Sequence, residues 1–137
     1  MNDSYLLDTN ICVHLLRGKY GVDKLIDNVG FANCYISEIT VAELKYGSEL
    51  GRQMGYHGKD ERLSDFLSAI NILPIIDVLD LFASEKARLR LAGTPADDNF
   101  DLLIGCTSVY YGMTIVTENI KDFKNIDKIK IENWIRR

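Results

Sequence analysis

The sequence predicts an α/β fold in which a mostly parallel sheet is covered on both faces by helices. Short apolar segments alternate along the chain with longer segments whose apolar residues recur at helical spacing. Such alternation indicates strands joined by right-handed helical crossovers, which place helices on both sides of the sheet. The chain has 137 residues, two prolines and no internal repeat. We therefore expect a single domain over residues 1–137.

Short apolar segments bounded by polar residues are expected to be the strands of this sheet. Pro74 falls within the third of them. Because proline cannot donate to a ladder of hydrogen bonds, this strand is expected at an edge of the sheet. The expected strands are residues 4–7, 33–36, 71–76, 114–117 and 128–131.

The expected helices begin at capping side chains and several end near glycines. Thr9 or Asn10 is expected to cap the first helix, Ser37 the third, and Asp77 or Asp80 the fifth. A loop is expected between the third and fourth helices, at residues 51–58. The expected helices are residues 11–16, 22–29, 38–47, 63–70, a segment ending at about 91, and 100–111.

Asp8 stands directly after the first strand, where the active sites of parallel sheets form. Two interpretations are open: a carboxylate that caps the following helix, or a functional carboxylate. We favour the second, because Thr9 and Asn10 already offer capping side chains.

Glu43 lies in a helix in which no residue three or four positions away is a cation. Ile39, Ala42 and Tyr46 are expected to face the core, which would place Glu43 at the edge of the buried face. An unpaired carboxylate is costly there unless it binds something, so Glu43 is a second candidate.

Asp101 is the single carboxylate of the apolar segment 100–106. Thr94–Pro95 offers a cap and a first-turn proline for this helix. Gly105 and Ser108 share a face with Asp101 and are expected to leave room beside it. The alternative is a first-turn acid that satisfies free backbone N–H groups.

Three further oxygen donors lie near these acids in the expected fold. Asp98 either caps the Asp101 helix or contacts a metal. Asn119 follows the strand at 114–117 and offers a carbonyl oxygen. Asp122 is more typical of a loop or capping acid but lies within reach of the same region.

Acids at separate strand ends repel one another, so they must take up protons or bind cations. Oxygen ligands without a histidine or cysteine set select Mg²⁺ or Mn²⁺ over zinc, and such sites suit phosphoryl transfer. The net charge of −4 is not that of a protein that grips phosphates with a basic surface. Bound cations would supply the positive charge locally.

Other classes of protein receive little support. Cys12, Cys34 and Cys106 are far apart in apolar surroundings and are expected to be buried and reduced. His14 and His57 are expected to have no catalytic role. No segment is long and apolar enough to span a membrane, and a cytoplasmic location is expected by default.

Four ordered motifs closely resemble those of PIN-domain ribonucleases, and within that superfamily those of VapC-type toxins from bacterial toxin–antitoxin pairs. The resemblance extends over nearly the whole chain, to Ile131–Trp134. The motifs are Tyr5–Asn10, Ile36–Gly47, Asp101–Gly105 and Val116–Asn119.

This resemblance implies a three-layer α/β/α sandwich and Mg²⁺- or Mn²⁺-dependent cleavage of RNA. Asp8, Glu43 and Asp101 match the metal-binding acids of the family. Asn119 stands where many relatives have a fourth acid, which puts a second metal in doubt, and Asp98 or Asp122 would compensate. Thr117 matches a hydroxyl that orients Asp8 or a metal-bound water.

The resemblance also implies a homodimer held inactive by a cognate VapB-type antitoxin. Among the scattered basic residues, Lys45 is the best candidate for a contact with RNA phosphates. Two alternatives remain open: a non-catalytic RNA-binding or regulatory module of the same fold, and a magnesium-dependent phosphotransferase with Asp8 as its aspartyl-phosphate nucleophile.

Overall fold

A computed structural model describes residues 3–58 and 60–137 and contains a five-stranded sheet in the order β3-β2-β1-β4-β5. Every neighbouring pair of strands is parallel. The predicted parallel α/β fold is therefore confirmed. The third strand lies at an edge as expected, but it ends at Leu73 and so does not contain Pro74. The strands are β1 (Tyr5–Leu7), β2 (Cys34–Ser37), β3 (Asn71–Leu73), β4 (Thr114–Val116) and β5 (Lys130–Glu132).

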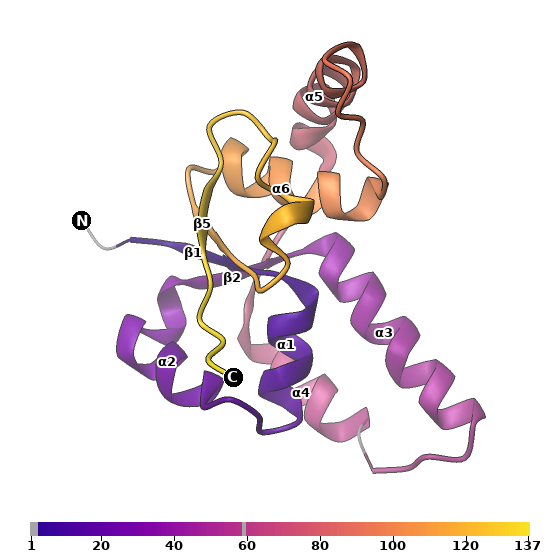
Figure 1. The fold of residues 1–137 in the computed structure, drawn as a ribbon. Helices are drawn as coiled ribbons and strands as arrows, with labels where there is room; N and C mark the ends of the chain where they lie inside the picture. The colour runs from indigo at the N-terminus through magenta and orange to yellow at the C-terminus, as the bar shows by residue number, and fades with distance from the viewer. Residues whose placement is uncertain (1–2, 59) are drawn as a thin grey trace.

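Helices cover both faces of this sheet. In Figure 1, α1, α2 and α4 lie on one side of the strands and α5 and α6 on the other, while α3 extends away from the end of β2. The helices are α1 (Thr9–Leu16), α2 (Val22–Val29), α3 (Glu38–Gln53), α4 (Asp60–Ala69), α5 (Leu79–Leu91) and α6 (Asn99–Tyr110). Three short 3-10 helices are η1 (Phe31–Asn33), η2 (Ile76–Val78) and η3 (Ile120–Asp122).

The central strands are buried on both faces and divide the core in two. Leu7 of β1 and Val116 of β4 pack under α1, α2 and α4. Leu6 and Ile115, which point to the opposite face, pack under α5 and α6. Burial on both sides explains why these strands read as uninterrupted apolar runs. None of the helices in the described residues is long and apolar enough to cross a membrane.

The expected end of the third helix was wrong. The third helix does not end at Gly47 but continues through Gly51 to Gln53. Each glycine costs a helix about 1 kcal/mol relative to alanine, and the exposed pair between Glu49 and Arg52 supports the last turns. Residues 51–53 of the expected loop are therefore helical.

The expected caps of α5 and α6 were also wrong. No side chain caps α5, so neither Asp77 nor Asp80 does so; the helix follows directly from η2 with Val78 at the cap position. Thr94–Pro95 lies in a loop, and α6 is capped by Asp98, whose side chain accepts hydrogen bonds from the backbone N–H of Phe100 and Asp101. The extended backbone of Asp98 makes it the cap.

Candidate active site

The ends of β1 and β4 lie side by side at the carboxyl edge of the sheet. Leu7 is paired with Val116, and the backbone N–H of Asp8 donates to the carbonyl of Val116 at 2.9 Å. The residues that follow these two strands, Asp8 and Thr117, therefore meet. The turn from β2 into α3 reaches the same edge, because β2 is the other neighbour of β1.

Asp8 is a buried carboxylate with both oxygens engaged. Its side chain is the cap of α1, since Oδ1 accepts from the backbone N–H of Thr9 at 2.8 Å. Capping by Thr9 or Asn10 was therefore a wrong expectation. Oδ2 accepts from the hydroxyl of Thr117, also at 2.8 Å. Asp8 is 4% exposed, so capping does not explain why a carboxylate stands here rather than a serine or threonine.

The pKa of Asp8 is raised mainly because burial penalises its charge. The hydrogen bonds from Thr117 and Thr9 oppose this shift, and the negative charges of Glu43 and Asp122 add to it. The charged form of Asp8 is thus energetically costly at this position, and a bound cation would offset that cost.

Thr117 is fully buried and links Asp8 to the loop after β4. Its hydroxyl accepts the backbone N–H of Asn119 at 3.0 Å and has a single hydrogen to donate, which it gives to Asp8. The direction of both hydrogen bonds is therefore fixed. This contact brings the half-buried Asn119 close to the acids.

Glu43 reaches the same edge from α3. Its Oε1 accepts from the hydroxyl of Thr9 at 2.6 Å, and the Thr9 hydroxyl lies 3.0 Å from that of the buried Thr40. Since Thr9 donates its hydrogen to Glu43, Thr40 must donate to Thr9. Sequence reasoning missed Thr9 and Thr40 as supports of this acid, although Thr40 precedes Glu43 by one helical turn.

The surroundings expected for Glu43 were partly wrong. Ile39 is buried as predicted, but Ala42 is exposed and Tyr46 is 68% exposed. In Figure 1, α3 extends away from the end of β2, which agrees with the exposure of Ala42 and Tyr46. Glu43 is half-buried where the buried residues Ile39 and Thr40 precede it on α3 and where Thr9 of α1 contacts it.

Asp101 lies in the first turn of α6 and is the most strongly perturbed acid of the group. Its pKa is raised to about 7, first by burial and then by the negative charges of Asp98, Asp8, Asp122 and Glu43, in that order. Within the described residues no hydrogen bond is donated to its carboxylate. The negative charges of the predicted acids are therefore close enough to repel one another, as expected from acids at converging strand ends.

Gly105 was expected to leave room beside Asp101, but it does not. A methyl group on Gly105 would overlap Cδ1 of Ile126 and lie 3.1 Å from Cδ1 of Phe123. Ser108 is buried and donates to the carbonyl of Gly105. Gly105 instead allows the loop after η3 to pack closely on α6, which keeps Asp122 near Asp101.

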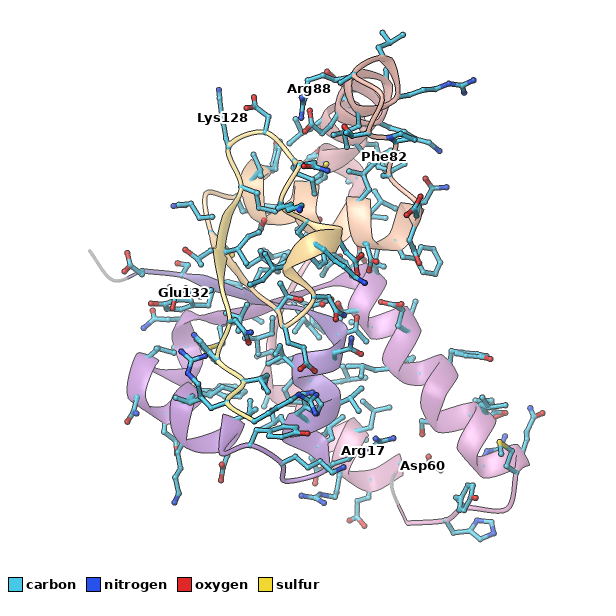
Figure 2. All side chains as sticks on the ribbon, in the orientation of Figure 1. Arg17, Asp60, Phe82, Arg88, Lys128 and Glu132 are labelled. Atoms are coloured by element: carbon cyan, nitrogen blue, oxygen red, sulfur yellow. The ribbon has the colours of Figure 1, made fainter. Side chains whose placement is uncertain are left out.

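That loop is also held from the other side by α5. Glu85 is buried, pairs with Arg88 at 2.7 Å, and accepts the backbone N–H of Asp127 at 2.6 Å. Arg88 donates to the carbonyl of Asn125 at 2.8 Å. Figure 2 shows Arg88 and Lys128 at the same end of the molecule.

Asp98 and Asp122 line a cavity of about 320 Å³ together with Asp101 and Lys121. Both acids are exposed at its rim. Asp98 performs the capping role that the sequence left open, and its oxygen that caps α6 is not available in full to a ligand. Of the two acids, Asp122 is therefore the more available to a ligand.

The donor set of this edge suits a hard cation. In the described part of the chain, no group of three or more acidic, histidine or cysteine residues is close enough to hold a metal as it stands. A magnesium site, however, commonly uses one or two carboxylates and completes its shell with water. All candidate donors are oxygens, and the three cysteines are buried with thiol pKa values raised by that burial.

A match to the PIN domain family model extends over residues 5–129. The chain belongs to the PIN domain family. A related PIN protein, Ribonuclease VapC2 of Rickettsia felis, is 33% identical over 136 residues, covering 95% of this chain and 97% of the relative. The tRNA(fMet)-specific endonuclease VapC of Salmonella typhimurium is 28% identical over 131 residues, with the same coverage of 95% and 97%.

Solved structures of PIN proteins agree with the fold. VapBC2 from Rickettsia felis, bound to a DNA fragment from its promoter, matches with a TM-score of 0.82 and 30% identity, over 95% of this chain and 98% of that one. DNA-bound VapBC from Salmonella typhimurium matches with a TM-score of 0.81 and 27% identity, over 96% and 98%. The predicted family and the PIN-like sandwich are both confirmed.

Proposed function

We propose that this PIN protein is a Mg²⁺- or Mn²⁺-dependent endoribonuclease and the toxin of a VapBC-type toxin–antitoxin pair. The observation that carries the proposal is that Asp8, Glu43 and Asp101 lie close enough for their charges to interact. Burial and the negative charges of neighbouring acids raise the pKa of Asp101 to about 7. Membership of the PIN domain family and relatives named as VapC ribonucleases support it.

Asp8 and Asp101 would be the principal metal ligands, with Glu43 beside them. Asn119, Asp122 and the free oxygen of Asp98 are further candidates for direct or water-mediated contact. A divalent ion bound there would polarise a phosphoryl oxygen, activate a water molecule and offset charge on the leaving oxygen.

The protein's own side chains prepare this site by fixing the acids. Thr117 holds Oδ2 of Asp8, and the backbone of Thr9 holds Oδ1, so this carboxylate has one orientation. The hydroxyl of Thr9 holds one oxygen of Glu43, Oε1. Fixed oxygens lose little freedom on binding a cation, which favours affinity and correct placement of the phosphate.

The proposed substrate is RNA, cut at phosphodiester bonds. The acidic edge would reject a polyanion without a bound cation, so substrate binding should depend on the metal. Lys45 is exposed on α3, two residues beyond Glu43, and is our candidate for a phosphate contact. A VapB-type antitoxin, a homodimeric state and a cytoplasmic location belong to the same proposal.

The phosphotransferase alternative conflicts with the environment of Asp8. An aspartyl nucleophile needs room for a phosphoryl group in line with its oxygen, yet Asp8 is 4% exposed and both oxygens accept hydrogen bonds. A metal ion needs only a remaining lone pair of one of these oxygens. The non-catalytic alternative keeps the fold and would bind RNA without cutting it.

Cleavage of pooled cellular RNA in Mg²⁺, Mn²⁺ or EDTA tests the proposal, with Asp8→Asn as the inactive variant and Asp65→Asn, an exposed acid in α4, as the matched control. We expect discrete cuts that require metal, persist in Asp65→Asn and vanish in Asp8→Asn. Tight RNA binding without cuts, in protein that binds Mn²⁺, would favour the non-catalytic module.

A further inference from the structure

His14 of α1 and Glu118, which follows Thr117, form a pair that no sequence pattern indicated. Nε2 of His14 lies 2.6 Å from Oε1 of Glu118, and the side chains are 14% and 17% exposed. Arg137 occupies the second carboxylate oxygen, at 2.9 Å. Both oxygens of Glu118 are therefore engaged by groups that lie outside the acidic edge.

Tyr20 completes this cluster. Its ring packs edge-on against His14 with centroids 4.7 Å apart, and its hydroxyl accepts from Arg137 at 2.8 Å. The guanidinium of Arg137 also lies over the Tyr20 ring, 4.9 Å from its centroid. Figure 1 shows the carboxyl-terminal segment beside α1, which agrees with these contacts.

The orientation of His14 depends on Glu118. Its other ring nitrogen, Nδ1, is buried and has no hydrogen-bond partner among the described residues. The orientation of a buried imidazole with a single hydrogen bond is fixed by that hydrogen bond. In return, the hydrogen bonds from His14 and Arg137 lower the pKa of Glu118 and keep it charged.

The carboxylate of Glu118 contacts His14 and Arg137 and not the acids of the edge. The acids whose charges raise the pKa of Asp8 are Glu43 and Asp122, and those that raise the pKa of Asp101 are Asp98, Asp8, Asp122 and Glu43. Glu118 is linked to the site through the backbone that it shares with Thr117, whose hydroxyl donates to Asp8.

We propose that His14 and Glu118 are positioning residues, which anchor the segment 117–119 to α1 and so set where Thr117 and Asn119 stand relative to Asp8. Asp8 caps the start of α1 and accepts the hydrogen bond that the Thr117 hydroxyl donates. Further along the same helix, His14 receives Glu118. The segment is thus held by two points of one rigid helix, and Asn119 follows because its N–H bonds to Thr117.

This inference rests on the proposed function, and a matched pair of variants tests it. His14→Phe keeps a ring but removes the donor to Glu118, whereas His14→Gln keeps an N–H donor at a similar reach. Arg52→Gln, which breaks the exposed pair with Glu49 on α3, is the control. For each variant we would measure kcat and KM for RNA, Mn²⁺ affinity by calorimetry, and amide exchange of Asn119 without metal.

We expect His14→Phe to lower kcat and Mn²⁺ affinity by about 10- to 100-fold, the usual effect of losing a group that orients metal ligands. With Mn²⁺ at saturation, KM for RNA should stay unchanged, and the Asn119 amide should exchange faster even without metal. His14→Gln should restore most of the loss, and Arg52→Gln should behave as the wild type. If His14→Phe does not fold, Glu118→Gln should show the same loss of kcat and of Mn²⁺ affinity.

Wild-type kcat, Mn²⁺ affinity and amide exchange in a folded His14→Phe protein would overturn the inference, as would loss in His14→Gln equal to that in His14→Phe. Failure of the proposed function is a separate result, because wild-type protein would then cut no RNA. The comparison of Mn²⁺ affinity and amide exchange among the variants would still decide the role of His14.

Discussion

Replacing Asp101 by asparagine should make the metal-free protein more stable while it destroys the proposed activity. Within the described residues the Asp101 carboxylate accepts no hydrogen bond, so an amide of the same shape loses no partner. What it removes is a negative charge that burial and four neighbouring acids oppose. Asparagine should therefore relieve the metal-free protein of this repulsion.

The size of the effect follows from the pKa of Asp101, which rises from 3.8 to about 7. Each unit corresponds to about 1.4 kcal/mol, so full burial would give roughly 4 kcal/mol. The side chain is partly exposed, and solvent screening reduces this to about 1–2 kcal/mol. For a domain of this length that is a rise in Tm of about 5 °C.

The dependence on pH identifies the cause. Because the folded-state pKa of Asp101 is raised, its contribution to stability is complete below the unfolded value of 3.8 and is lost as pH rises through about 7. The variant has no such loss. Its advantage should be greatest at pH 8 and should shrink as pH falls toward 4.

Thermal unfolding in EDTA between pH 4 and 8 measures this difference, with Asp65→Asn as the surface control. Adding Mg²⁺ at pH 8 should stabilise the wild type more than Asp101→Asn and narrow the gap. A variant no more stable than the wild type at pH 8, or a gap independent of pH, would refute the account of repulsion among these acids.

Three other substitutions have defined outcomes. Gly105→Ala should destabilise the protein by about 1–3 kcal/mol in urea unfolding, because the new methyl group overlaps Ile126. Ile126→Val removes the overlapping carbon and should recover part of the loss, whereas additive effects of the two substitutions would argue against the contact. Thr117→Val should cost about 1–3 kcal/mol of stability in the same assay and should lower kcat, because Asp8 loses its buried hydrogen-bond donor. An unchanged kcat would count against a role of Thr117 in holding Asp8. Asn119→Asp should raise Mn²⁺ affinity measured by calorimetry at pH 8, whereas equal or weaker binding would remove Asn119 from the ligand set.

The features that were predictable from sequence depend on local patterns. Apolar runs located the strands, and the positions of Asp8 and Asp101 relative to those runs brought them to one edge once the sheet was parallel. Val22–Val29 was predicted with its observed limits because its apolar residues recur at helical spacing between two glycines.

Features that depend on backbone conformation or on distant contacts were not predictable. Asp8, Thr9 and Asn10 are all good caps, and the extended backbone of Asp8 decides between them. The role of Gly105 depends on Ile126, and that of His14 on Glu118, 104 residues away. No periodicity within one segment carries information about such pairs.

The most direct test of the central claim is anomalous diffraction from crystals soaked in Mn²⁺. The account predicts an ion bound by oxygens of both Asp8 and Asp101, with Glu43 in contact directly or through water, and its loss in Asp8→Asn crystals. A Mn²⁺ ion elsewhere, in protein that still cuts RNA when that metal is present, would contradict the assignment of these acids.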